Sequence, residues 1–174
     1  KIHGAVDMIS ELANGGRSSM VFSSAVATTG TLTERMRLDS SGNLGLGVTP
    51  SAWGSGYKAL DIGTLGSIFH NNAGANTWVS NNTYFNGTNW LSKAAGSAQS
   101  YRLQADLGHV WRNSVGTITA AGQTITWSDA MTLDASGRLI VGGTTASGTA
   151  ATFNGGQASV VIAQPSSTSY GGIR

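Results

Sequence analysis

Apolar residues along this chain alternate with polar ones more often than they recur at the spacing of a helix. The clearest example is ERMRLDSSGNLGLG at residues 34–47, where Met36, Leu38, Leu44 and Leu46 share one parity. Two such alternating runs on either side of a short polar segment are typical of a β-hairpin. The sequence therefore predicts two short strands joined by a tight turn.

The polar segment DSSGN between these runs has the residues that a tight turn needs. Gly42 can adopt a positive φ at no steric cost, and the carboxylate of Asp39 can accept hydrogen bonds from the backbone of its own turn. A second copy, DAMTLDASGRLIVG at residues 129–142, has Asp134 and Gly137 in the same places. We therefore interpret Asp39, Gly42, Asp134 and Gly137 as structural turn residues.

The glycine-rich end of the first copy, GNLGLG at residues 42–47, also has glycine spacing suggestive of a phosphate-binding loop. Such a loop binds phosphate because it opens a helix whose N-terminal amides point at the anion. Here a strand pattern follows the glycines, so the helix that this mechanism needs is missing. The pattern favours a hairpin turn.

The repeat divides the chain into four segments. Residues 1–50 and 101–150 are predicted hairpin modules, because each contains one copy preceded by strand-like alternation. Residues 51–100, rich in Asn, Gly and aromatic residues, are predicted to form short strands and turns as an insertion or knob. Residues 151–174 begin a third, truncated module. This organisation predicts an all-β fold of short strands and hairpins.

The composition changes this picture from a single folded chain to an assembly. Of the 174 residues 25 are Gly, and only 10% are charged, against roughly 25% in ordinary soluble domains. Large aliphatic residues are scarce, yet a net charge of +2 is too small to favour disorder. The separation of the repeats by an unlike insert also favours assembly of chain against chain over stacking of the repeats along one chain. We therefore expect an elongated, interwoven homotrimer whose strand edges pair between chains.

The charge pattern and the histidines argue against several partners and cofactors. Arg35 and Arg37 are the nearest approach to a cationic cluster, so we expect no nucleic-acid partner. No apolar run reaches about 18 residues, and we expect no membrane insertion. His3, His70 and His109 are single and far apart, and Cys is absent, so we predict no metal and no cofactor. One His from each of three chains around a threefold axis is the alternative.

The carboxylates give little support to catalysis, since glycoside hydrolysis needs two of them about 5 to 10 Å apart. Turn chemistry accounts for Asp39, Asp106 and Asp134, while Glu34 and Asp129 hold equivalent places at two strand starts. We predict no catalytic residue, and a depolymerase with a carboxylate pair between subunits is the alternative. The acids without a structural explanation are Asp7, Glu11 and Asp61.

The aromatic residues of the middle segment admit two interpretations. Sugar rings stack on aromatic rings, and Asn amides both donate to and accept from hydroxyls. The same rings can instead fill a core in which aliphatic residues are scarce. Trp111 and Trp127 lie in regular alternating runs, which favours the core for both. The candidate receptor or glycan contacts of the middle segment are Trp78, Asn81, Asn82, Tyr84, Asn86 and Trp90.

The phrases ERMRLDSSGNLGLGVTP and DAMTLDASGRLIVGGTT resemble a repeat found in the distal parts of tailed-bacteriophage tail fibres and tail spikes. The segments AWGSGYKALDIG and TITWSDAMTLDASG resemble the same proteins, and the likeness covers residues 5–150 in separate patches. The resemblance implies parallel homotrimers on the virion tail, made in the host cytoplasm. In many such fibres an intramolecular chaperone domain follows these repeats. The opening KIHGAVDM lacks an initiator Met, and we expect an interior part of a longer protein.

The function that this resemblance implies is that of a structural and adhesive segment of a tail fibre, which attaches the phage to its bacterial host. The expected partners are other copies of this chain, other tail proteins of the virion, and a glycan or protein of the host cell surface. Two alternatives stay open: a tailspike-type polysaccharide depolymerase and a purely structural fibre spacer.

Overall fold

The computed structural model describes residues 4–10, 18–25 and 30–142. In this part of the chain all regular secondary structure is β-strand, which confirms the predicted all-β class. The predicted third module at residues 151–174 lies outside the described residues. The strands are β1 (Gly4–Ser10), β2 (Ser18–Ala25), β3 (Leu32–Leu38), β4 (Leu44–Leu46), β5 (Tyr57–Ile62), β6 (Gly66–Asn71), β7 (Asn76–Asn81), β8 (Tyr84–Phe85), β9 (Trp90–Leu91), β10 (Gln99–Gln104), β11 (Gly108–Val115), β12 (Thr126–Leu133) and β13 (Leu139–Val141).

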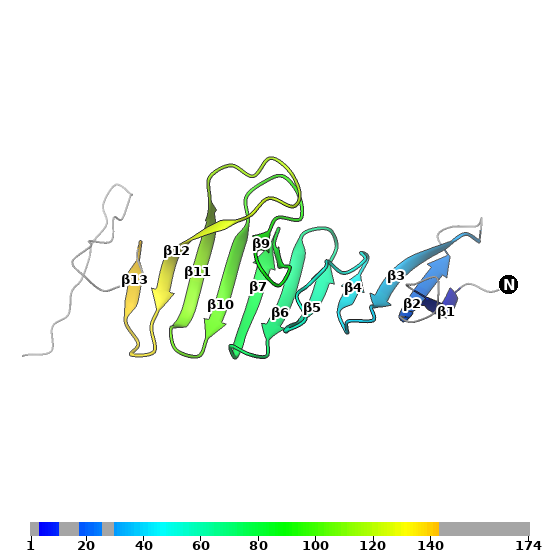
Figure 1. Cartoon of the computed structure of the whole chain (residues 1–174), viewed down its shortest axis with the longest axis horizontal. Coiled ribbons are helices and arrows are strands. Elements are labelled where there is room, and N and C mark those ends of the chain that lie inside the picture. Colours follow the sequence, from blue (N-terminus) through cyan, green and yellow to red (C-terminus); the bar gives the residue numbers. More distant parts are fainter. Residues whose placement is uncertain (1–3, 11–17, 26–29, 143–174) are drawn as a thin grey trace, which may run out of the picture.

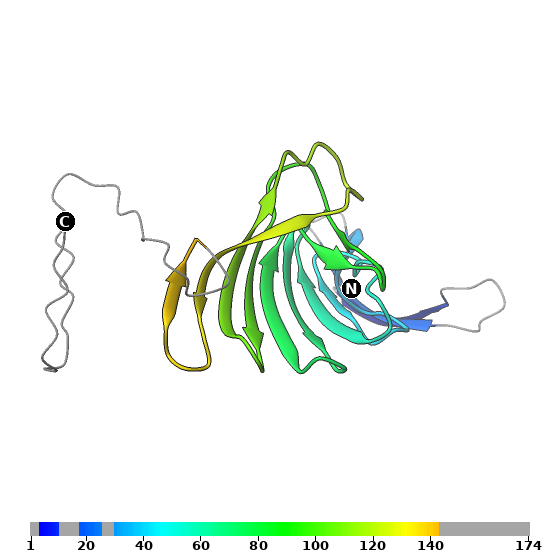
Figure 2. The ribbon, with the colours of Figure 1, turned by 60° about the vertical axis from the view of Figure 1, so that its left-hand side comes forward.

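Eleven of these strands form one sheet, in which the order in space is almost the order in sequence. Figure 1 shows the strands side by side in a long row from β1 to β13. Neighbours pair antiparallel, except for β4 and β5, which pair parallel. The sheet is curved and twisted along the row, as Figure 2 shows. Among the described strands, β1 and β13 are the two edges, and the sheet has two large faces.

The middle of the chain partly continues the sheet and partly leaves it. β5, β6 and β7 extend the row of strands, and the sheet resumes at β10. Residues 82–98 lie between β7 and β10 and contain β8 and β9, which form a two-stranded sheet of their own. Figure 1 shows this short sheet in front of the long row. We call residues 82–98 the insertion.

The repeated phrase forms the same hairpin twice, as β3–β4 and β12–β13, with equivalent pairing registers. Gly42 and Gly137 both have a φ of 79°, which an L side chain rarely adopts. The Oδ1 atom of Asp39 accepts two backbone N–H groups of its turn at 2.9 and 2.7 Å. The Oδ1 atom of Asp134 accepts the two equivalent N–H groups at 2.9 Å each. The repetition in sequence is therefore a repetition of one turn and one strand register.

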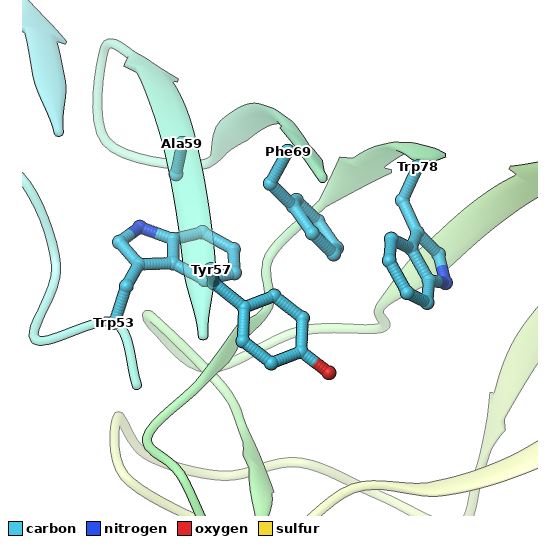
Figure 3. Close-up of a cluster of buried hydrophobic side chains, with 5 residues drawn as sticks. All are labelled: Trp53, Tyr57, Ala59, Phe69 and Trp78. Carbon is cyan, nitrogen blue, oxygen red and sulfur yellow. The ribbon is translucent and has the colours of Figure 1, made fainter. Parts of the chain in front are cut away.

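The face of the sheet that the insertion covers buries an aromatic core, shown in Figure 3. Phe69 and Trp78, on neighbouring strands, stack with ring centroids 4.9 Å apart. Large aromatic rings bury much apolar area per residue, so a few of them offset the scarcity of aliphatic residues. The buried members of the core are Trp53, Tyr57, Ala59, Phe69 and Trp78, and Tyr84, Phe85 and Trp90 of the insertion pack against them.

Candidate interaction surface

The face of the sheet opposite the aromatic core, which we call the open face, presents an unbroken row of apolar side chains. Each strand contributes one residue, and the pairing registers place these residues in line across the whole sheet. Several are well exposed, among them Met8 at 66% and Val79 at 49%. This apolar row consists of Met8, Met20, Leu38, Leu44, Leu60, Ile68, Val79, Tyr101, Trp111, Met131 and Val141.

A second line of residues beside the apolar row, which we call the flanking row, changes its chemistry along the sheet. It is apolar from β1 to β5, has a glycine on β6, and carries amide and hydroxyl groups from β7 to β12. The Asn81 amide donates to the Gln99 side-chain oxygen over 3.2 Å, and Asn113 is the partner of Gln99 on the next strand. The flanking row consists of Val6, Phe22, Met36, Leu46, Ile62, Gly66, Asn81, Gln99, Asn113 and Ser128.

The two rows are large enough to form a protein interface. Eleven strands about 4.8 Å apart make a band roughly 50 Å long, and two residue rows make it about 14 Å wide, or roughly 700 Å². The apolar row and the β1–β5 part of the flanking row make up about three quarters of this band, or roughly 500 Å². The largest apolar patch of an ordinary monomer measures about 300 to 600 Å², and a standard interface buries about 800 Å² on each partner. Neither row contains a charged residue. A surface of this kind is typical of a site where another molecule binds.

A depression of about 430 Å³ lies on the open face where β7, β10, β11 and β12 meet. Its aromatic part is formed by Tyr101 and Trp111, whose ring centroids are 5.0 Å apart with 32° between the planes. The Tyr101 hydroxyl and His109 Nδ1 form a hydrogen bond of 2.5 Å, and these two rings also stack. The rest of the lining consists of the three amides of the flanking row together with Val79, Ser80, Ser100, Arg112 and Ala130.

The structure does not bring the six candidate contacts of the middle segment together on one surface. Trp78 and Asn82 are buried, at 3% and 1% exposure, so neither side chain is presented to a ligand. Trp90 packs against the aromatic core, as does Tyr84, which matches the alternative of core packing. Asn86 is exposed in the β8–β9 turn, on the covered side of the sheet, where its Oδ1 accepts two backbone N–H groups. Asn81, on the open face, is the candidate that lines the depression.

Two of the buried or half-buried residues have roles that sequence patterns did not indicate. The Asn82 side chain donates to Gly96 O over 2.8 Å and accepts from Ala94 N over 2.8 Å, so it connects the two ends of the insertion. Trp111, expected in the core, is instead half-buried on the open face beside Tyr101. Both outcomes depend on which face a residue occupies, and no local signal in the sequence gives that.

The covered face also contains a buried ion pair that ties the insertion to the sheet. Lys93 Nζ lies 2.7 Å from Asp61 Oδ1, and the two side chains are 6% and 1% exposed. The Ser67 hydroxyl donates to Asp61 over 2.9 Å and accepts from Lys93 over 2.6 Å. Burial alone would raise the pKa of Asp61, but hydrogen bonds from Lys93 and the backbone N–H of Ser51 hold that pKa below its ordinary value. Asp61 thus has a structural role.

Three of the remaining carboxylates form ion pairs with arginines. Ion pairs join Glu34 to Arg37, Asp129 to Arg112 and Asp134 to Arg138. Within the described ranges no three His, Asp or Glu side chains come close enough to hold a metal ion. The same ranges contain no helix that is long and apolar enough to cross a membrane. Glu11 and His3 lie outside the described residues.

Comparisons with protein families, with curated proteins and with solved structures find no significant match to this chain. A proposal about its function therefore depends on the open face and on the repeated phrases of the sequence.

Proposed function

We propose that this chain is a structural and adhesive segment of a phage tail fibre, which assembles with copies of itself through the open face and attaches to a bacterial surface. The observation that carries the proposal is the unbroken apolar row across eleven strands. Leaving such a row in water is unfavourable, because the free energy of hydration rises with the apolar area exposed. An assembly that covers the row removes this cost.

A second copy of this chain is the partner that the surface fits best. The aliphatic half of the band, on β1 to β6, offers roughly 350 Å² per chain for contact with another copy, about half of what a standard interface buries on each side. An uncharged, largely aliphatic band on one chain meets an equal band on another without desolvating a charge. The resemblance of the repeated phrases to tail-fibre repeats supports three copies, arranged as an elongated, interwoven homotrimer. The resemblance is also the support for a place on the virion tail, beside other tail proteins.

The test of assembly is the molar mass in solution, measured by light scattering coupled to size-exclusion chromatography. We expect the mass of three chains for the protein as it is. The double variant Leu46→Lys/Ile62→Lys places two facing charges in the β4–β5 half of the band, where both residues are exposed. We expect it to elute as a single folded chain, because the charges would have to be buried unpaired in the assembly.

A matched control keeps the added charge but moves it off the open face. Thr64 and Asn72 are exposed residues of two neighbouring turns, and Thr64→Lys/Asn72→Lys should leave the mass unchanged. Circular dichroism of all three proteins checks that the sheet is intact. A single-chain mass for the unmodified protein would contradict the assembly proposal.

A further inference from the structure

The open face changes its chemistry between β6 and β10, and this change separates two kinds of surface. On β1 to β6 the apolar row is entirely aliphatic or Met. On β10 and β11 it becomes Tyr101 and Trp111, and the flanking row beside them becomes amides. A copy of the chain needs only apolar contact, which the first half already provides. The second half has polar groups placed beside rings, and it therefore suits a different partner.

The aromatic pair provides a surface on which a flat apolar group can stack. Tyr101 and Trp111 are paired residues of neighbouring strands, with ring centroids 5.0 Å apart and only 32° between their planes. The hydrogen bond between the Tyr101 hydroxyl and His109 Nδ1 and the stacking of the two rings hold the tyrosine in place. Both rings are partly exposed at the depression. Rings that are ordered before binding lose little conformational entropy when a ligand stacks on them.

The amides provide a line of hydrogen-bonding groups parallel to the rings. Asn81, Gln99 and Asn113 are partners on three consecutive strands of the sheet, and all three are exposed. Successive strands are about 4.8 Å apart, so the amides extend over roughly 10 Å. One Asn81 hydrogen is donated to Gln99 Oε1. The other amide hydrogens and the oxygens of Asn81 and Asn113 match the hydroxyl groups of a ligand, which both donate and accept.

The charges around the depression do not favour an ionic ligand. Arg112 is the charged residue that lines the depression. Its guanidinium is paired with Asp129 over 2.9 Å and lies 5.0 Å from the centroid of the Trp127 ring. The side chains of that ion pair are only 15% and 14% exposed. The other residues that line the depression are uncharged: Val79, Ser80, Asn81, Gln99, Ser100, Tyr101, Trp111, Asn113 and Ala130.

We propose that this depression binds neutral saccharides, with a pyranose ring stacked on Tyr101 and Trp111 and its hydroxyls bonded to Asn81, Gln99 and Asn113. The saccharide is a ligand for the adhesive role, so the inference rests on the proposed function. It assigns that role to β7, β10 and β11, and leaves the aliphatic half on β1 to β6 to contact between copies.

The experiment is ligand-observed saturation-transfer NMR with neutral hexasaccharides of glucose, galactose and N-acetylglucosamine, and with a hexamer of galacturonic acid as the charged comparison. We expect saturation transfer to at least one neutral hexasaccharide at millimolar concentration, strongest at ring protons on one face, and little to the charged one. Trp111→Ala should weaken binding at least tenfold, and Trp111→Phe should retain part of it.

Because Trp111→Ala can also disturb the sheet, a second variant keeps the test independent of folding. Gln99→Ala/Asn113→Ala removes two exposed amides, and it should lose binding with an unchanged unfolding midpoint. The matched control is Asn72→Ala, an exposed amide in the β6–β7 turn, which should bind as the unmodified protein does. Transfer to none of the neutral hexasaccharides overturns the site, and so does transfer that the amide variant leaves unchanged.

Light scattering on the same samples separates this inference from the proposed assembly. A single-chain protein that still binds saccharide through these residues contradicts the assembly and supports the site. Binding that occurs only in Leu46→Lys/Ile62→Lys, and not in the assembled protein, shows that copies cover the depression, and overturns the saccharide site.

Discussion

Gly45 lies where the chain passes close to itself just after the first repeated turn. A Cβ atom on this residue would be 1.9 Å from Val48 O and 2.9 Å from Pro50 Cδ, distances at which the backbone must move. We predict that Gly45→Ala destabilises the protein by about 1–3 kcal/mol, the usual effect of overpacking. Chemical denaturation measures this. Gly56→Ala is the control, because nothing lies within 4 Å of a Cβ there, and equal midpoints for the two variants would contradict the prediction.

The buried ion pair gives a second prediction for a single residue. Lys93→Met leaves the Asp61 carboxylate buried without its cation, and we expect a loss of about 3–5 kcal/mol at pH 7. Thermal unfolding of both proteins measures it. Methionine has nearly the same length as lysine, so lost packing contributes little to the expected difference in stability.

The pH dependence of this pair has a definite sign. The pKa of Asp61 is lower in the folded protein than its value of 3.8 in a model compound, so its stabilising contribution is present above that value and is lost as the pH falls below it. In Lys93→Met burial acts without the cation and raises the Asp61 pKa, so protonation relieves the buried charge. The difference in unfolding free energy between the unmodified protein and Lys93→Met should therefore narrow as the pH is lowered from 7 to 3. A difference that is constant over this range would be against the assignment.

At the scale of the elements, the repeated turn provides the most local prediction. Asp39→Ala removes the acceptor of two backbone N–H groups and should cost about 1–2 kcal/mol, whereas Asp39→Asn retains one side-chain oxygen and should cost less. The unfolding midpoints of the two variants test this order. Equal midpoints for the two variants would mean that the negative charge, and not the turn hydrogen bonds, matters at this position.

Residue patterns predict the hairpins of this chain but not the register between all of its strands. Alternation and turn residues predicted both hairpins, because each depends on contacts between near neighbours in the sequence. The same alternation places Glu34 and Met36 on one side of a strand, but the register shifts between Phe22 and Ser23, and Glu34 pairs with Ser23 instead. Glu34 therefore meets Arg37, with contacts of 2.8 and 2.6 Å. One extra residue in a strand reverses the faces of the residues beyond it.

At the scale of the whole molecule, the scarcity of large aliphatic residues is resolved in two ways. Aromatic residues fill most of the core on the covered face, while many exposed aliphatic and Met side chains of the sheet, such as Met8, Leu46 and Val79, lie on the open face. A single chain with this distribution is stable only if burial on the covered face offsets the apolar surface that the open face exposes. The molar mass of Leu46→Lys/Ile62→Lys, compared with that of the unmodified protein, tests whether copies of the chain cover the open face.

Local patterns in the sequence account for the strands, the two equivalent hairpins, the turn roles of Asp39 and Asp134, and the shortage of large aliphatic residues. The tertiary structure decided which rings are buried and which are presented. Trp78 and Trp111 both lie in alternating strands, yet Trp78 stacks on Phe69 beneath the insertion and Trp111 stands beside Tyr101 on the open face. Alternation within a strand determines which residues share a face of the sheet. The pairing of distant strands and the position of residues 82–98 determine which face is covered.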